Sequence, residues 1–212
     1  MRIILNDSCC LIDLRKVGLL TKVLNLPYRM AVVYPLRAQE LLGIPEHEWA
    51  SLEDAGLEVI DVSGELVAEA EQAKRLVRGP SFTDCLSFVQ ARALGHGSIL
   101  LTNDRKLREL ALRHQVEVHG TLWLLDELLR HALLSATEAN NVLLAWDNDA
   151  LVFLPKAEVQ QRLFHYQGHG ETSTAFQKFV PDLHLQRSAG VGPAERLGGA
   201  VEVVDKGQDL LA

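Results

Sequence analysis

Cysteine is scarce in this chain and is not arranged for disulfide bonds. Only 3 of the 212 residues are cysteine, and two of them, Cys9 and Cys10, are neighbours. Adjacent cysteines rarely satisfy the geometry of a bridge. The sequence therefore excludes a disulfide-stapled extracellular domain, and we expect the cysteines to be small buried side chains in a reducing compartment.

Long apolar runs are also missing, although 48% of the residues are hydrophobic. No segment approaches the roughly 20 apolar residues that a membrane-spanning helix needs. The N-terminal segment MRIILNDSCC turns polar too soon to act as a secretory signal. We therefore expect no membrane association and a cytoplasmic location.

Basic residues are fewer than acidic residues over the whole chain. There are 21 basic and 28 acidic residues, giving a net charge of -7, which argues against a protein that coats nucleic acid along its entire surface. Residues 71–113 reverse this balance, because their basic residues outnumber their acidic ones. The basic residues of this segment are Lys74, Arg75, Arg78, Arg92, Arg105, Lys106, Arg108 and Arg113. One basic segment in an acidic protein is compatible with a polyanionic substrate held at one place.

Short apolar segments alternate with longer helical patterns. The predicted strands are residues 2–5, 30–34, 57–60, 98–102 and 116–118. The predicted helices are residues 9–25, 36–43, 64–78, 82–95, 105–114, 121–133 and 136–146. Parallel neighbouring strands need such crossover connections, so the alternation predicts an α/β fold with a mostly parallel central sheet flanked by helices. Ligands of such folds bind at the carboxyl ends of the strands.

The C-terminal part of the chain differs in composition from the rest. Of the 15 glycines, 7 fall in the last 49 residues, and helical periodicity fades past residue 163. We assign residues 1–150 to the main domain and residues 151–212 to a C-terminal helix and extension of unknown role. Within that extension, composition alone does not distinguish a tail from a partner-binding segment.

Four acidic residues stand at positions where chemistry or simple helix capping could explain them. Asp7 and Asp104 each follow a predicted strand, where aspartate commonly caps the next helix. Asp84 comes three residues after Ser81, in the pattern of a capping box. Glu40 falls within a predicted helix, where a solvated surface position is the simpler explanation. If the four lie together, however, they raise one another's pKa unless a cation neutralises them, and Mg²⁺ or Mn²⁺ prefers such oxygen ligands.

The segments that contain these acids resemble the motifs of a known family. They are ILNDSCCLIDL, YPLRAQELL, TDCLSFVQARALG and SILLTNDRKLRELA. In order, spacing and strand context they resemble the four acidic motifs of PIN-domain ribonucleases, the family that includes the VapC-type toxins, over residues 1–150. The resemblance implies a nuclease domain in which Asp7, Glu40, Asp84 and Asp104 are the catalytic acids and bind one or two Mg²⁺ or Mn²⁺ ions.

The resemblance also implies a substrate and partners. Ser8 and Asn103 lie beside motif acids and are expected to support them, and Arg105, Lys106 and Arg108 are expected to contact the phosphates of RNA. We therefore expect a metal-dependent endoribonuclease, as the toxin of a toxin–antitoxin pair with an antitoxin protein as partner, or as a stand-alone nuclease. The alternative is a non-catalytic PIN-fold module that binds RNA or protein.

A helical segment near residue 125 carries an unusually apolar face. Its apolar side chains are Trp123, Leu124, Leu125, Leu128 and Leu129. We interpret this face mainly as part of the core, with a surface for a second copy or a partner as the other interpretation. We also expect the protein to form a homodimer.

Overall fold

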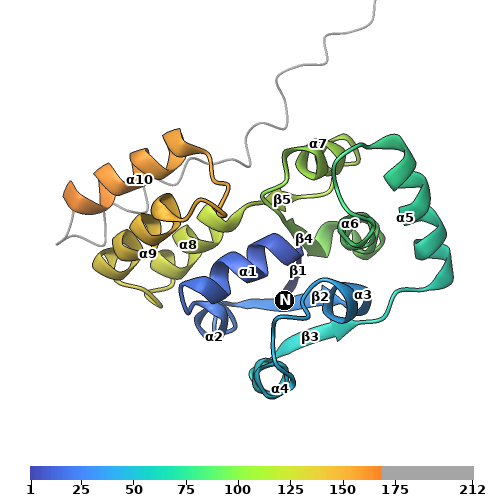
Figure 1. Cartoon of the computed structure of the whole chain (residues 1–212), viewed down its shortest axis with the longest axis horizontal. Helices are drawn as coiled ribbons and strands as arrows, with labels where there is room; N and C mark the ends of the chain where they lie inside the picture. Colours follow the sequence, from blue (N-terminus) through green and yellow to red (C-terminus); the bar gives the residue numbers. More distant parts are fainter. Residues whose placement is uncertain (169–212) are drawn as a thin grey trace, which may run out of the picture. The chain divides into compact units, whose positions relative to one another are not determined.

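A parallel β-sheet forms the centre of the protein, in a computed structural model that describes residues 1–168 (Figure 1). The strands are β1 (Arg2–Asn6), β2 (Tyr28–Val33), β3 (Leu57–Ile60), β4 (Ser98–Leu101) and β5 (Val118–His119). They pair in the order β3-β2-β1-β4-β5, and every pair is parallel. The predicted α/β fold with a parallel central sheet flanked by helices is confirmed.

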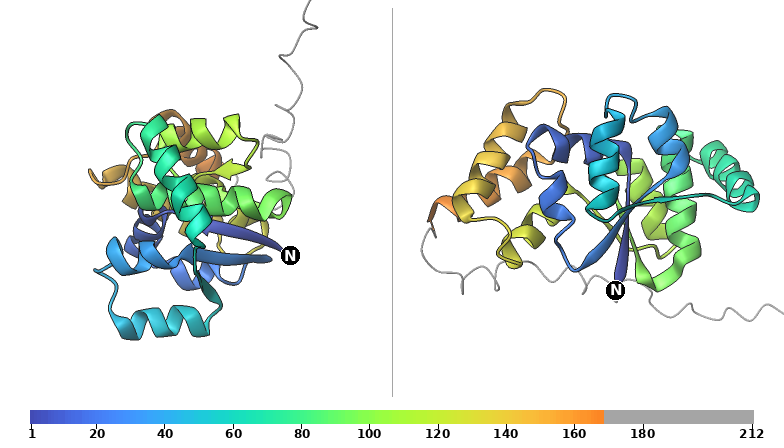
Figure 2. Two further views of the ribbon diagram at one scale, coloured as in Figure 1. Left: turned by 90° about the vertical axis from the view of Figure 1, so that its right-hand side faces the viewer. Right: turned by 90° about the horizontal axis from the view of Figure 1, so that it is seen from below.

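Helices cover both faces of this sheet, as two further views show (Figure 2). The helices are α1 (Ser8–Lys16), α2 (Leu20–Val23), α3 (Tyr34–Gln39), α4 (Glu46–Asp54), α5 (Gly64–Leu76), α6 (Phe82–Leu94), α7 (Arg105–Arg113), α8 (Thr121–Arg130), α9 (Ala136–Asn148) and α10 (Lys156–Gly168). Helix α6 packs against β1, β2 and β4, while α1 and α8 lie on the opposite side of the sheet. Burial on both faces explains why β1 and β4 are almost wholly apolar.

The order of the strands creates a switch point between β1 and β4. From β1 the chain proceeds to β2 and β3 on one side, then crosses to β4 and β5 on the other. At the carboxyl ends the two central strands are still joined, because the Asp7 amide donates to the Leu101 carbonyl at 3.0 Å. In open parallel sheets, ligands bind in a crevice at the carboxyl ends of the strands, at such a switch point.

The predicted helix over residues 9–25 is two helices, because the chain turns at Gly18. Its φ of +68° is a left-handed conformation that glycine adopts without strain. The Leu19 amide donates to Leu14 and the Gly18 amide to Arg15, the paired bonds of a Schellman motif. Glycine at this position therefore ends α1 and allows α2 to start in a new direction.

The region between β2 and β3 differs most from the sequence-based expectation. Helix α3 starts and ends earlier than the predicted residues 36–43, so Glu40 lies at its C-cap rather than inside a helix. Helix α4 was not predicted. It begins after Pro45, which suits a helix start, but it buries only Trp49 and Leu52 and so gives a weak apolar pattern.

Part of the C-terminal segment packs onto the domain. Helix α10 packs against α9, and Arg162 forms a buried ion pair with Asp126 of α8 at 2.6 Å. Tyr166 donates to the same carboxylate at 2.8 Å. The rest of the predicted extension, residues 169–212, lies outside the described residues. Among residues 1–168, no helix is both long and apolar enough to cross a membrane.

Candidate active site at the carboxyl ends of the strands

Asp7 is a buried carboxylate placed directly after the central strand. It is the N-cap of α1, and its Oδ1 accepts a hydrogen bond from the Cys10 amide at 2.8 Å. Only 1% of its surface is exposed. Burial raises the pKa of Asp7 to about 6, the charge of Asp84 adds to this, and hydrogen bonds from Thr102 and Cys10 oppose it. Helix capping thus explains the hydrogen bond to one oxygen of Asp7. It does not explain why a carboxylate is buried at a position where its ionisation is unfavourable.

Asp104 occupies the corresponding position after β4. It is the N-cap of α7, and its Oδ1 accepts from the Leu107 amide at 2.7 Å. Its own amide donates to Thr102 Oγ1 at 3.1 Å. Because the Thr102 hydroxyl also bonds to Asp7, this buried threonine links the two capping acids across the switch point.

Asp84 lies in the first turn of α6, where the predicted capping box is confirmed. Its Oδ2 accepts from the Ser81 amide at 2.7 Å, and its amide donates to Ser81 Oγ at 3.0 Å. Burial raises the pKa of Asp84, the bonds from Ser81 lower it, and the charges of Glu40 and Asp104 raise it again. Asp84 therefore lies close enough to each of the other three acids for their charges to interact.

Glu40 reaches the same place from the end of α3. Its Oε1 accepts a short hydrogen bond from the hydroxyl of Thr83, which is 2% exposed. The Thr83 hydroxyl also lies 2.7 Å from Ser81 Oγ. The position of Glu40 is thus tied to α6 through two hydroxyl groups, although α3 and α6 are far apart in the sequence.

The four acids share a second property, which is that none of them is paired with a cation. Throughout the described part of the chain, no ion pair involves Asp7, Glu40, Asp84 or Asp104. Three of them also keep one oxygen without a hydrogen bond from any residue of 1–168, namely Oδ1 of Asp84, Oδ2 of Asp104 and Oε2 of Glu40. Carboxylates that repel one another and keep oxygens without hydrogen bonds are suited to bind a hard divalent cation.

The acids do not form a ready-made cage. Among residues 1–168, no three His, Cys, Asp or Glu side chains stand close enough together to hold a metal ion. A divalent ion would have to draw the carboxylates inward or reach some of them through water, as Mg²⁺ commonly does. A set of donors made only of oxygen atoms fits such an ion. The distances between the carboxylates require that they move inward or bind the ion through water.

The two expected supporting residues differ in their surroundings. Ser8 is buried in the first turn of α1 and bonds to the thiol of Cys9. Asn103 links β4 to α8, since its Oδ1 accepts from the Thr121 amide at 3.0 Å and its Nδ2 donates to Thr121 Oγ1 at 2.6 Å. A Cβ at Gly120 would lie 2.8 Å from Asn103 Oδ1, so only glycine leaves room for this arrangement.

Asp13 is a fifth acid near the site, and the sequence-based predictions missed it. It is buried in α1, and Asn103 Nδ2 donates to its Oδ2 at 3.4 Å. Burial raises the pKa of Asp13 to about 6, partly offset by Lys16 and Asn103. The pKa of Cys9 indicates the proximity, because partial burial of its thiol and then the charges of Asp7, Asp84 and Asp13 raise this pKa to about 11. An aspartate inside the otherwise apolar stretch CCLIDL was the available signal.

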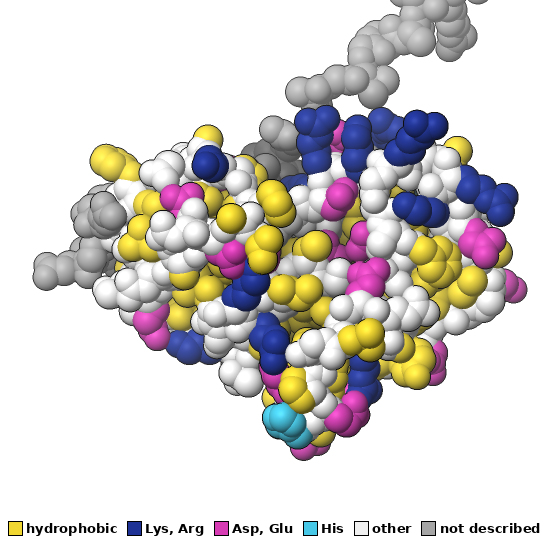
Figure 3. All heavy atoms as spheres, viewed as in Figure 1, with side chains coloured by type: hydrophobic (Ala, Val, Ile, Leu, Met, Phe, Trp, Pro, Cys, Tyr) yellow, Lys and Arg dark blue, Asp and Glu magenta, His cyan; other side chains and the backbone are white. Residues whose placement is uncertain are grey.

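Basic side chains flank the acids on one side. Arg105 and Lys106 are exposed at the start of α7 and share a single acid, Glu109, at 3.1 and 3.2 Å. Lys106 lies close to Gly79 in the loop after α5, because a Cβ built at Gly79 would lie 3.7 Å from Lys106 Cγ. The same loop contains the cation Arg78. Figure 3 shows acidic side chains around α6, between α3 and α7, and Lys and Arg side chains along the neighbouring edge over α7 and the end of α5.

Arg108 has a different environment from the other two expected RNA contacts. It is half-buried, and its Nη1 donates to the Thr102 carbonyl at 3.2 Å. This bond braces the loop between β4 and Asp104. Arg105 and Lys106 are therefore better placed than Arg108 to meet a polyanion.

Removing the Thr83 hydroxyl tests whether the position of Glu40 matters. In Thr83→Val we expect any metal-dependent activity to fall roughly tenfold, as for other groups that orient a metal ligand. Thr83→Ser retains the hydroxyl and should retain activity, and Thr21→Val, on the exposed face of α2, is the matched control. Kinetic assays of the three variants check this, and unaltered activity in Thr83→Val would contradict a role for the bond.

A family model described as a PIN domain matches residues 3–164. The match covers the sheet except for Arg2, together with all four acids and most of α10. A search of curated proteins found no match to this chain.

Proposed function

From the premise that the chain belongs to the PIN-domain family and carries its nuclease-type fold, we propose that it is an endoribonuclease. It hydrolyses RNA phosphodiester bonds and depends on Mg²⁺ or Mn²⁺. The observation that carries the proposal is the convergence of four carboxylates from four separate elements at one switch point without a cation partner. Clusters of this kind are costly to the fold, and metal binding is the function that offsets the cost.

In this proposal the residues of the chain bind and orient. Asp7, Asp84, Asp104 and Glu40 would hold a divalent ion, and Thr102, Thr83 and Ser81 fix the orientation of these carboxylates. The chemistry that this ion would supply is an activated water and stabilisation of the charge on the phosphate. Arg105 and Lys106 hold the phosphates of the strand beside the acids. A toxin role with a cognate antitoxin, and a homodimer, are further parts of the proposal.

The second candidate is a PIN-fold module that binds RNA or protein without cleaving it. The observation that favours it is the lack of three ligands in close reach of one another among residues 1–168. Incubation of labelled single-stranded RNA with the full chain, in Mn²⁺ or in EDTA, separates the two. Internal cleavage that appears in Mn²⁺ and stops in EDTA supports the enzyme, whereas RNA that stays intact while it binds the protein supports the module.

The basic residues at the start of α7 provide a separate test. In Arg105→Ala and Lys106→Ala we expect KM to rise several-fold and kcat to stay the same, because each variant lacks a phosphate-binding cation but no metal ligand. The slope of log KM against log salt should fall by about 0.7 for each RNA phosphate that is no longer neutralised. Arg113→Ala, exposed in the last turn of the same helix, is the control. Salt titrations that give three identical slopes would contradict this role.

A further inference from the structure

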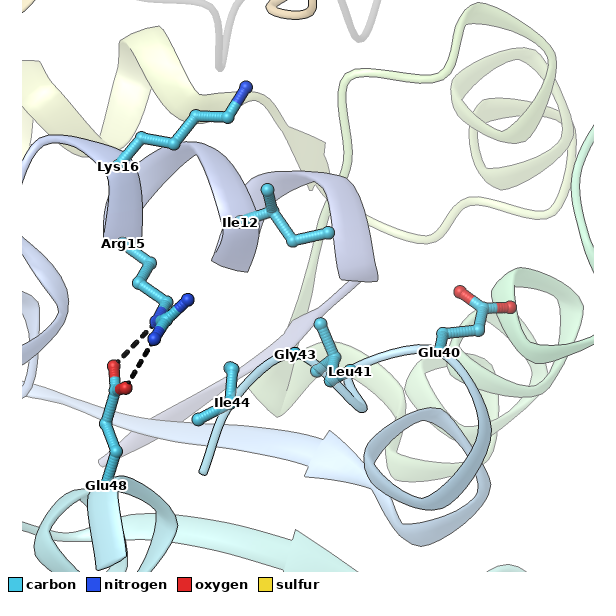
Figure 4. Close-up of a pocket in the computed structure, with 8 residues that line it drawn as sticks. All are labelled: Ile12, Arg15, Lys16, Glu40, Leu41, Gly43, Ile44 and Glu48. Atoms are coloured by element: carbon cyan, nitrogen blue, oxygen red, sulfur yellow. Dashed lines mark hydrogen bonds and ion pairs between the residues drawn. The ribbon is translucent and has the colours of Figure 1, made fainter. Parts of the chain in front are cut away.

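A groove opens beside the acids, on the side away from α7. It has a volume of about 650 Å³, within the range of roughly 300–1,000 Å³ for small-ligand sites. It runs between α1 and the chain that joins α3 to α4, and Figure 4 shows Glu40 at one end and the Arg15–Glu48 pair at the other. We propose that this groove holds one unpaired nucleobase of the RNA, next to the phosphate that reacts. The proposal rests on the proposed function and specifies its substrate.

One wall of the groove is a fixed planar cation. Arg15 Nε and Nη2 donate to the two oxygens of Glu48 at 2.8 and 2.7 Å. This two-point contact holds the guanidinium plane in place while 40% of the Arg15 side chain stays exposed. Proteins that recognise single-stranded RNA stack unpaired bases on such guanidinium planes. A base that stacks here costs the protein little entropy, because the arginine is already ordered.

The remaining walls suit a flat, uncharged group. Ile12, Leu41 and Ile44 line the groove, and Ile12 is the accessible one of the three, with 39% of the residue exposed, whereas Leu41 and Ile44 are buried. The two cations that line the groove are neutralised, Arg15 by Glu48 and Lys16 by Asp149 at 2.8 Å. A phosphate would find no unpaired cation among the lining residues, so the groove is better matched to a base than to the backbone.

The order of features along the surface also favours RNA over a protein segment. Asp104 caps α7, which carries Arg105 and Lys106, and Asp84 interacts with the charges of both Asp104 and Glu40. Glu40 in turn lines the groove. A strand with its phosphates on α7 therefore crosses the acids before it reaches the groove. A peptide could bind in the groove, but it has no phosphates to contact the cations of α7 beyond the acids.

Gly43 allows the groove to be filled without disturbing the fold. It lines the groove, it lacks a left-handed φ, and a Cβ built there meets nothing within 4 Å. Gly43→Leu places a branched side chain in this space. Gly97→Leu is the matched control, since Gly97 has the same free surroundings but directly precedes β4, at the opposite end of the strands.

The test scans a single 4-thiouridine along a short single-stranded RNA and irradiates each RNA with the full chain in EDTA. We expect one position to crosslink to peptides containing residues 12–16 or 40–48, and the yield to fall at least tenfold in Gly43→Leu but not in Gly97→Leu. Crosslinks confined to other segments, or a yield that Gly43→Leu leaves unchanged, overturn the proposal. An unchanged yield in Gly43→Leu would favour a protein partner as the occupant of the groove.

Cleavage in Mn²⁺ gives the companion readout. An abasic nucleotide at the crosslinked position should slow wild-type cleavage about as much as Gly43→Leu slows cleavage of normal RNA, with no further loss when both changes are combined. If the two changes together slow cleavage by the product of their separate effects, the base and the residue 43 side chain do not act at the same site. If wild type crosslinks in the groove but cleaves no RNA, the proposed endonuclease fails while the nucleobase site stands.

Discussion

Replacing Asp7 with asparagine is expected to abolish metal-dependent RNA cleavage and, at the same time, to make the protein more stable. Metal ligands contribute several kcal/mol to the transition state, so we expect a loss of about 10³-fold or more in kcat. Asparagine can still accept the hydrogen bond from the Cys10 amide and cap α1. The loss of activity would therefore not come from a damaged helix.

The gain in stability follows from the direction of the pKa shift. Burial raises the pKa of Asp7 from 3.8 to about 6, so the folded protein binds this proton more tightly than the unfolded chain does. The free energy of unfolding therefore falls between about pH 4 and pH 6 as the group ionises, and stays low above pH 6. A shift of this size corresponds to at most about 3 kcal/mol, or roughly 6–12 °C in Tm, which Asp7→Asn should recover at pH 7.5.

Thermal unfolding and cleavage assays on the same preparations check both halves of this prediction. The stabilisation should shrink toward pH 4, where the wild-type carboxyl carries its proton. Asp54→Asn, on the exposed end of α4, removes an equal charge away from the site and should change neither activity nor the pH profile. Cleavage that survives in Asp7→Asn would remove Asp7 from the mechanism.

Binding of Mn²⁺ should depend steeply on pH. A metal needs the ionised carboxylates, so protons compete with it below the pKa of Asp7, about 6. We expect affinity to fall about tenfold for each pH unit below 6. At pH 7.5, Mn²⁺ at about 100 times its Kd should stabilise the fold by about 2.7 kcal/mol, and this increment should fall to about 1.4 kcal/mol at pH 5 at the same metal concentration.

The central acid provides the matching variant. Asp84→Asn keeps an oxygen that can accept from the Ser81 amide, but it removes the charge that interacts with Asp7, Glu40 and Asp104. We expect the Mn²⁺-dependent rise in Tm to disappear in this variant and to persist in Asp54→Asn. Calorimetric titration without RNA measures the same loss directly. A pH-independent affinity, or full binding by Asp84→Asn, would place the ion elsewhere.

Much of the fold could be predicted because the apolar strands and their helices repeat along the chain. The parallel sheet follows from segments such as RIIL and SILL, which are buried on both faces. Boundaries were less accurate where one residue decides the outcome. Gly18 divides the first helix, and α4 buries too few side chains to produce a clear period.

The candidate site was predictable in its acids and not in what holds them. Asp7 and Asp104 follow strands and Asp84 completes a capping box, which are local features of the sequence. Thr102 and Thr83 bring these acids into contact with elements far away in the chain, and nothing near them in the sequence indicates those partners. Asp13 has the same limitation, because its tie to Asn103 spans 90 residues.

The position of β1 between β2 and β4 has a consequence for protein synthesis. Asp7 is translated about a hundred residues before its neighbours across the switch point, Thr102 and Asp104. A nascent polypeptide that ends before β4 has only half of the crevice and one edge of its central strand unpaired. Catalytic competence would therefore arise late, after most of the domain has left the exit tunnel.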